Sequence, residues 1–271
     1  VVEEDSALER FLDPLAREQW LAVADMTGAG PDLRITLAAR LSEEDALDLG
    51  GVETKQEARY DPATRRVRAR RTRRMGAIVL EETPLPSPSP ELVREGLLQA
   101  VRESGFGILP HAAQLESLIA RVNVLGAAIG PPWPNDFRLI LSERLNDWLA
   151  PVLDGASSLD SPDGQTLAHA AASLLDWPLP RDLERLAPPG WTTPAGRRVE
   201  IDYVAEGGPR AECKVQEVFG TVTHPTIADG RIALTLALLS PAHRPVAVTK
   251  DLPAFWRGGY HDMRKDMKGR Y

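Results

Sequence analysis

A proline run at residues 83–90, Thr-Pro-Leu-Pro-Ser-Pro-Ser-Pro, divides this sequence. Proline has a fixed φ and no backbone N–H, so the run cannot continue a sheet and makes a stiff connection between its flanks. Before it, short apolar segments have the spacing of strands; after it, apolar residues recur with the helical period. The sequence therefore predicts a domain boundary in this run, with a β-rich domain at residues 1–86 before it.

Five segments of the N-terminal domain have the pattern of β-strands: residues 20–25, 33–41, 56–60, 65–71 and 75–80. In the second of them, Leu33, Ile35 and Leu37 alternate with polar or small residues, which predicts one buried face. Ser42 and Asp45 suit the start of a short helix after this strand. Five short strands with one inserted helix predict a small OB-like β-barrel with an acidic lead-in.

Helical spacing dominates residues 87–187, with Ser89 placed to cap the first helix. Residues 188–271 return to strands, among them an apolar one at 231–239 that is expected to be buried on both faces. Asp251 suits the N-cap of a last helix. The predicted fold class is therefore α+β and multi-domain: an OB-like β-barrel, a helical middle region and a C-terminal α+β domain.

The composition narrows the cellular setting. The chain has 271 residues, a net charge of −7 and a single cysteine, Cys213. One cysteine excludes an internal disulfide and a thiolate zinc site, and it fits a reducing cytoplasm. The acidic N-terminus lacks the basic and apolar regions of a signal peptide, and no run approaches the length of a membrane helix. We therefore expect a cytoplasmic protein with no membrane partner and no metal site.

Charge is distributed unevenly along the chain. Residues 1–56 carry thirteen acidic against five basic side chains, whereas residues 57–74 carry eight arginines against two acidic residues. Guanidinium groups bind phosphates in a bidentate manner and stack on exposed bases. The candidate site for single-stranded nucleic acid is therefore the arginine-rich strand: Arg65, Arg66, Arg68, Arg70, Arg71, Arg73 and Arg74.

Strand geometry predicts that these arginines are not equivalent. Arg66, Arg68 and Arg70 should share one face, with Val67 and Ala69 on the other, while Arg65 lies near the turn. The alternative is a structural role, in which the arginines form a solvated face paired with the acidic residues of 1–56.

Three stretches carry a resemblance to a known family. They are Trp20-Leu-Ala-Val-Ala-Asp25, Arg74-Met-Gly-Ala-Ile-Val-Leu80, and the run from Leu238 to Trp256 followed by Met267-Lys-Gly-Arg-Tyr271. In this order they resemble the C-terminal part of the bacterial HrpB-type ATP-dependent helicases, relatives of the DEAH-box RNA helicases. The resemblance implies that the chain is the C-terminal third of a longer helicase, without its motor, and that an OB-like domain occupies the corresponding place.

The resemblance also implies a function. The expected role is that of a non-catalytic accessory region, which holds single-stranded nucleic acid, with RNA implied by the family, and braces the motor domains of the same parent chain. No cofactor is expected in this fragment, because ATP and magnesium belong to the motor domains. The alternative is a protein-interaction platform whose arginines are structural.

A second basic cluster lies at the C-terminus. Its members, expected late in or after the last helix, are Arg264, Lys265, Lys268 and Arg270. They form a possible secondary site for a polyanion. Basic residues at a helix C-terminus also complement the helix dipole, which explains them without a ligand.

Cys213, His224 and Asp229 occur in an order that some cysteine hydrolases use. No glycine- or aromatic-flanked nucleophile motif surrounds Cys213, and strand alternation equally makes it a small core residue. The prediction is therefore that no residue of this chain is catalytic.

The chain is expected to be inert as an ATPase. The dipeptide Gly-Lys of a phosphate-binding loop does not occur, nor does an Asp-Glu-x-His motif. Without a loop to cradle the phosphates and an acidic group to hold magnesium, the chain lacks the groups for phosphoryl transfer. The measurement is phosphate release by purified protein, and steady release above the blank would contradict the prediction.

Overall fold

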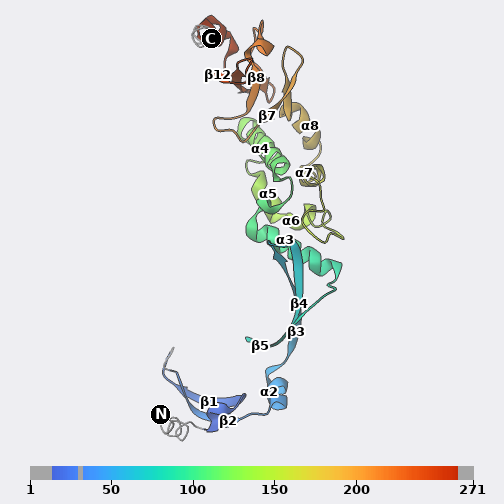
Figure 1. Cartoon of the computed structure of the whole chain (residues 1–271), viewed down its shortest axis with the longest axis vertical. Helices are drawn as coiled ribbons and strands as arrows, with labels where there is room; N and C mark the ends of the chain where they lie inside the picture. The colour runs from blue at the N-terminus through green and yellow to red at the C-terminus, as the bar shows by residue number, and fades with distance from the viewer. Residues whose placement is uncertain (1–13, 30–32, 262–271) are drawn as a thin grey trace. The chain divides into compact units, whose positions relative to one another are not determined.

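The computed structural model describes residues 14–29 and 33–261 (Figure 1). These residues belong to two compact units, each described here by itself. The first comprises Val1–Ala58 and Arg68–Pro88, and the second comprises Arg59–Val67 and Ser89–Tyr271. The boundary therefore crosses the chain three times, and residues 59–67 belong to the second unit.

The elements up to residue 84 contain two sheets rather than one. In chain order they are η1 (Pro14–Arg17), β1 (Leu21–Thr27), β2 (Arg34–Arg40), α2 (Glu43–Gly50), β3 (Glu53–Asp61), β4 (Arg66–Met75) and β5 (Ile78–Pro84). Strands β1 and β2 pair only with each other in the described part of the chain, and β3, β4 and β5 form a separate three-stranded sheet. The prediction of a closed OB-like barrel is therefore wrong, because its strands do not join one sheet.

The β1–β2 sheet also differs from the prediction in its burial. Leu33, Ile35 and Leu37 were expected on a buried face, yet they are 51%, 51% and 61% exposed. Met26, which pairs with Ile35 in register, is 52% exposed. Alternation correctly indicated a strand with an apolar face, but the described residues provide no element that covers it. We call Met26, Leu33, Ile35 and Leu37 the apolar stripe.

The last strand of the three-stranded sheet, β5, begins and ends later than the predicted strand at residues 75–80. A turn at Gly76, with a φ of 56°, ends β4 at Met75, and β5 runs from Ile78 to Pro84 into the proline run. Proline is tolerated there because β5 is an edge strand. The proline run thus continues a sheet for two residues before it becomes a connection.

The three helix N-caps predicted from the sequence are confirmed. The Ser42 hydroxyl accepts a hydrogen bond from the Asp45 N–H at 3.1 Å at the start of α2. Ser89 accepts from the Leu92 N–H at 3.3 Å at the start of the next helix. Asp251 accepts from the Ala254 N–H at 2.9 Å at the start of the last. Each bond satisfies a backbone donor that the first helical turn leaves without a partner.

The second unit begins with helices that pack around one central helix. They are α3 (Pro90–Ser104), η3 (Phe106–Ile108), α4 (Ala112–Ile129), α5 (Phe137–Glu143), α6 (Leu145–Trp148), α7 (Gly164–Ala172) and α8 (Leu179–Leu186). Apolar residues recur along α4 with the helical period, and this face is buried: Leu115, Leu118, Ile119, Val122 and Leu125. Arg144 separates the short helices α5 and α6.

α4 is also the one helix among the described residues that has the length and composition of a membrane span. The prediction that no run approaches the length of a membrane helix is therefore wrong by length and composition. Its most apolar side chains belong to the hydrophobic core, where they pack with residues of α3, α5 and α7. These contacts account for its apolar character as that of a core helix.

The chain from Gly190 onward forms a five-stranded sheet in the order β12-β11-β8-β7-β6. Its strands are β6 (Gly190–Thr192), β7 (Arg198–Asp202), β8 (Arg210–Lys214), β11 (Thr235–Leu239) and β12 (Pro245–Thr249). β8 and β11 are parallel, and the other neighbours are antiparallel. The remaining elements are η4 (Val215–Val218), the short pair β9 (Thr226–Ile227) and β10 (Ile232–Ala233), and α9 (Leu252–Arg257).

Helices and sheet of the second unit share one hydrophobic cluster, which runs from Leu97 of α3 to Phe255 of α9. Tyr60 and Val67, from the β3–β4 hairpin, pack against the same cluster. The separate domains at 87–187 and 188–271 stay a prediction.

Candidate nucleic-acid interface

The arginines of β4 lie on a strand whose buried side changes along its length. Val67 and Ala69 are half-buried while Arg66 and Arg68 are exposed, as alternation predicts. Beyond residue 70 the order reverses, because Thr72 is buried and Arg71 and Arg73 are exposed. The exposed arginines therefore occupy opposite sides of β4 in its two halves, and Arg66, Arg68 and Arg70 do not form one exposed row.

Arg65 has a structural role in the second unit. Its guanidinium donates to both carboxylate oxygens of Asp160, at 3.0 and 3.1 Å from Nε and 2.6 Å from NH2. These hydrogen bonds lower the pKa of the Asp160 carboxyl. Beside them, Arg66 forms an isolated antiparallel bridge with Ser158. The turn of the β3–β4 hairpin is thus anchored to residues 158–160.

Two further arginines pair with acidic residues of β5. Arg70 donates to Glu82 at 2.5 Å, and Arg73 donates to Glu81 at 3.4 Å. The structural alternative expected partners among residues 1–56, but Arg65, Arg70 and Arg73 pair with Asp160, Glu82 and Glu81. The sequence feature that indicates Glu81 and Glu82 as partners is the turn at Gly76, because it sets β5 antiparallel to β4.

Arg66 and Arg71 form no ion pair with any residue in the described ranges, 14–29 and 33–261. Arg74 is half-buried, and its Nε has no acceptor in that part of the chain. Arg73 has a longer contact with its partner, 3.4 Å, than Arg65 and Arg70 have with theirs, and an exposed pair of this kind contributes only about 0–1 kcal/mol, so Arg73 is available to a stronger anionic partner. The secondary basic site, Arg264, Lys265, Lys268 and Arg270, lies outside the described residues.

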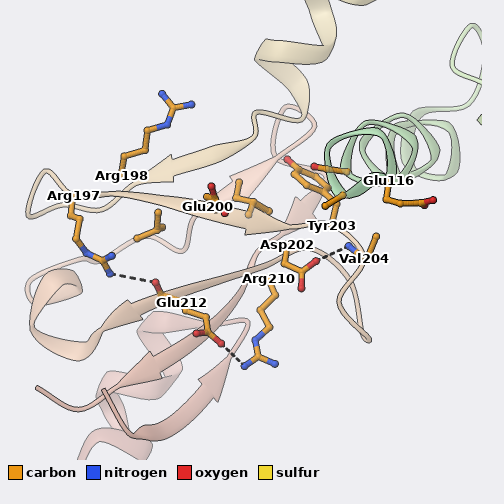
Figure 2. Close-up of a pocket in the computed structure, with 13 residues that line it drawn as sticks. Glu116, Arg197, Arg198, Glu200, Asp202, Tyr203, Val204, Arg210 and Glu212 are labelled. Carbon is orange, nitrogen blue, oxygen red and sulfur yellow. Dashed lines mark hydrogen bonds and ion pairs between the residues drawn. The ribbon is translucent and has the colours of Figure 1, made fainter. Parts of the chain in front are cut away.

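A second candidate is a cleft of about 1000 Å³ in the second unit, between α4 and the outer side of β7 and β8 (Figure 2). Along β7, Val199 and Ile201 are buried whereas Arg198, Glu200 and Asp202 face outward. The cleft is therefore lined by charges of both signs.

Most of the arginines in this cleft are already paired. Arg197 donates to both oxygens of Glu217 at 2.6 and 2.8 Å, which lowers the pKa of Glu217. Arg210 donates to Glu212 at 2.9 Å (Figure 2). Glu116, from α4, pairs with Arg138. Such mutually satisfied charges are those of a polar sheet face, so this cleft is the weaker candidate for a polyanion.

Cys213, His224 and Asp229, the residues of the cysteine-hydrolase pattern, have structural roles. Cys213 is 0% exposed, and burial raises its pKa to about 11. His224 accepts the Leu252 N–H at Nδ1, so its proton is on Nε2, which donates to the Leu234 carbonyl at 2.6 Å. Asp229 pairs with Arg185. Both ring nitrogens of His224 are bound to backbone, so His224 is not available to Cys213 as a general base. Among the described residues no group of histidine, cysteine, aspartate and glutamate is placed to hold a metal ion.

Cys213 is expected to resist thiol reagents in the folded protein. Its thiolate is disfavoured by burial, and the thiolate is the reactive form. In the unfolded chain the thiol loses its proton at lower pH, so this shift makes the fold less stable as the pH rises above the ordinary thiol range. The measurement is alkylation with and without denaturant; rapid alkylation of the native protein would contradict the burial of this side chain.

Two protein-family models match separate regions of this chain. A family model described as "ATP-dependent helicase C-terminal" matches residues 148–271. A second, the "ATP-dependent RNA helicase HrpB, connector region", matches residues 52–85, which contain β3, β4 and β5. The arginine-rich strand thus lies in a connector rather than in the predicted barrel.

Individual proteins similar to this chain are helicases of the same family. The ATP-dependent RNA helicase HrpB of Escherichia coli (strain K12) is 34% identical over 266 residues, which are 96% of this chain and 33% of that protein. Two crystal structures match over 96% of this chain: E. coli DExH-box NTPase HrpB, with a TM-score of 0.66 at 33% identity, and E. coli DEAH/RHA helicase HrpB, with 0.62 at 30%.

Fold, segment order and identity together define the C-terminal region of an ATP-dependent helicase. The chain belongs to the HrpB family of these helicases. It spans about a third of the length of the relatives it matches.

Proposed function

We propose that this chain is a non-catalytic accessory region of an ATP-dependent helicase and that it contacts single-stranded nucleic acid through β4. The observation that carries the proposal is the exposure of Arg66 and Arg71 without an ion pair in the described part of the chain. A guanidinium group without an acidic partner is a strong, bidentate donor for phosphate oxygens. The E. coli relative is named as an ATP-dependent RNA helicase, which supports RNA as the nucleic acid.

The motor domains of the same parent chain are the proposed protein partner. The apolar stripe on β1–β2 supports this contact, because an isolated two-stranded sheet with an uncovered apolar face is only marginally stable in water. ATP and magnesium are then bound by the motor domains, and the complete helicase works in the cytoplasm. The stripe also favours the second candidate, a protein-interaction platform that makes no contact with nucleic acid.

The test uses two matched double variants with equal loss of charge. Arg66→Gln/Arg71→Gln removes two exposed arginines that form no ion pair in the described part of the chain, whereas Arg65→Gln/Arg70→Gln removes arginines that pair with Asp160 and Glu82. The first variant is expected to weaken binding of a labelled RNA strand on the order of tenfold at low salt. It should also reduce the log–log salt slope by about 1.4, from roughly 0.7 per phosphate. Fluorescence anisotropy across a salt series measures both quantities.

The control variant should keep the salt slope of the unmodified chain, because its arginines already have acidic partners. Equal slopes for the unmodified chain and the Arg66/Arg71 variant, with both folded, would overturn the role of β4. No binding of RNA by the unmodified chain would favour the protein-interaction platform.

A further inference from the structure

A second cleft, in the first unit, is not explained by the proposed function. It has a volume of about 710 Å³ and lies between the start of β1, helix α2 and the β4–β5 hairpin. Its walls combine apolar side chains, among them Leu21, Leu47, Ile78 and Val79, with the polar side chains of Gln19, Glu43, Arg73 and Glu81. Ile78 and Val79 are 50% and 47% exposed, so they offer apolar surface to a ligand. The volume lies in the range of sites for small organic molecules.

Two polar groups in this cleft are poorly satisfied. Trp20 lines it, and the indole N–H of Trp20 is shielded from solvent with no acceptor in the described ranges. A buried indole N–H normally has a partner, because leaving it without one is unfavourable. Arg73 also lines the cleft, held by Glu81 only at 3.4 Å and with both side chains about half exposed.

We propose that this cleft binds a base of the nucleic-acid strand, which rests on the proposed function of β4. A nucleobase is planar and apolar on its faces, and its edge carries carbonyl and ring-nitrogen acceptors. It therefore meets both needs of the site: stacking on the indole and apolar walls, and an acceptor for the N–H of Trp20. A phosphate leaves the apolar walls in water, and an aliphatic side chain leaves the N–H without an acceptor.

The register of β4 links the cleft to the arginines. Arg71 and Arg73 are two residues apart on one side of the strand, where both are exposed. A strand whose phosphate lies on Arg71 can direct its neighbouring base to Arg73, whose guanidinium stacks on bases as well as binding phosphates. The cleft thus gives the proposed interface a base contact in addition to its phosphate contacts.

The first arm of the test compares a single-stranded RNA oligonucleotide with an abasic strand of equal length. The full chain is expected to bind the intact strand about tenfold more tightly. Ile78→Glu, which places a charge on the apolar wall, should remove this difference. Trp20→Phe, which keeps an aromatic ring and loses the N–H, should reduce it by about half on a logarithmic scale. Val248→Glu, at a 65% exposed strand residue of the second unit, is the control and should leave it unchanged.

The second arm observes the cleft without any phosphate. Uridine and adenosine are titrated into nitrogen-15-labelled protein, and the indole resonance of Trp20 is identified by its loss in Trp20→Phe. A shift of this resonance supports the base site even if no oligonucleotide binds, in which case only the role of the arginines fails. Equal binding of intact and abasic strands, with an unshifted indole resonance, overturns the base site and leaves phosphate binding by β4 intact.

Discussion

Replacing Arg121 by alanine is expected to destabilise the second unit by about 3 kcal/mol. Arg121 is on the central helix α4 and only 7% exposed. Its Nε donates to the Ala187 carbonyl at 2.6 Å, and its NH2 donates to Glu184 at 2.6 Å. The alanine variant leaves the Ala187 carbonyl without its donor and opens a cavity between α4 and the end of α8. Chemical denaturation followed by tryptophan fluorescence measures the loss.

Glu184→Gln separates the two bonds of Arg121. The Glu184 side chain is 62% exposed, so water replaces much of what the ion pair contributes, and the expected loss is under about 1 kcal/mol. If both variants lose the same stability, the ion pair rather than the buried carbonyl bond holds α8, and the account given for Arg121 is wrong.

Gly126→Ala is expected to destabilise the same unit by about 2–3 kcal/mol. In an open helix the change from glycine to alanine stabilises by about 1 kcal/mol, so the expected sign is reversed. The reason is the close approach of residues 134–135 to α4, where an added Cβ would lie 2.7 Å from the Pro134 carbonyl carbon and 3.1 Å from Asn135 Cα. Backbone atoms cannot move aside as the end of a side chain can.

Gly107→Ala is the matched control for Gly126. An added Cβ at Gly107 meets no atom within 4 Å, so this variant should be as stable as the unmodified chain or slightly more so. Thermal unfolding of both variants, compared under one condition, tests the pair. A Gly126→Ala protein that melts with or above the unmodified chain would show that the loop is able to withdraw from α4.

The sequence predicted best what is decided within a few residues. The caps at Ser42, Ser89 and Asp251 follow from a side chain and a backbone N–H three residues later. The buried stripe of α4 follows from helical period alone. The pattern of residues 211–219 is ambiguous between strand and helix, and the chain uses both, since β8 ends at Lys214 and a 3-10 helix follows.

The errors concern partners that are distant in sequence. Arg65 finds Asp160 across 95 residues, and no local pattern indicates that pairing. The barrel failed for the same reason, because alternation predicts strands but not which strands pair. The sequence identifies Trp20 only as part of a predicted strand and of a stretch that resembles the family, since it does not show that the indole N–H is shielded and has no acceptor in the described residues.

Residues 59–67 belong to the second unit, so this unit cannot be cut from the chain, or exchanged with that of a related helicase, at the proline run alone. A shortened chain that starts at residue 89 would lack Tyr60 and Val67 from its core and would leave Asp160 without Arg65. A shortened chain that keeps these contacts must therefore begin no later than residue 59. A connector inherited from a different relative must arrive with a matching turn at 158–160, so these distant positions are expected to change together rather than singly.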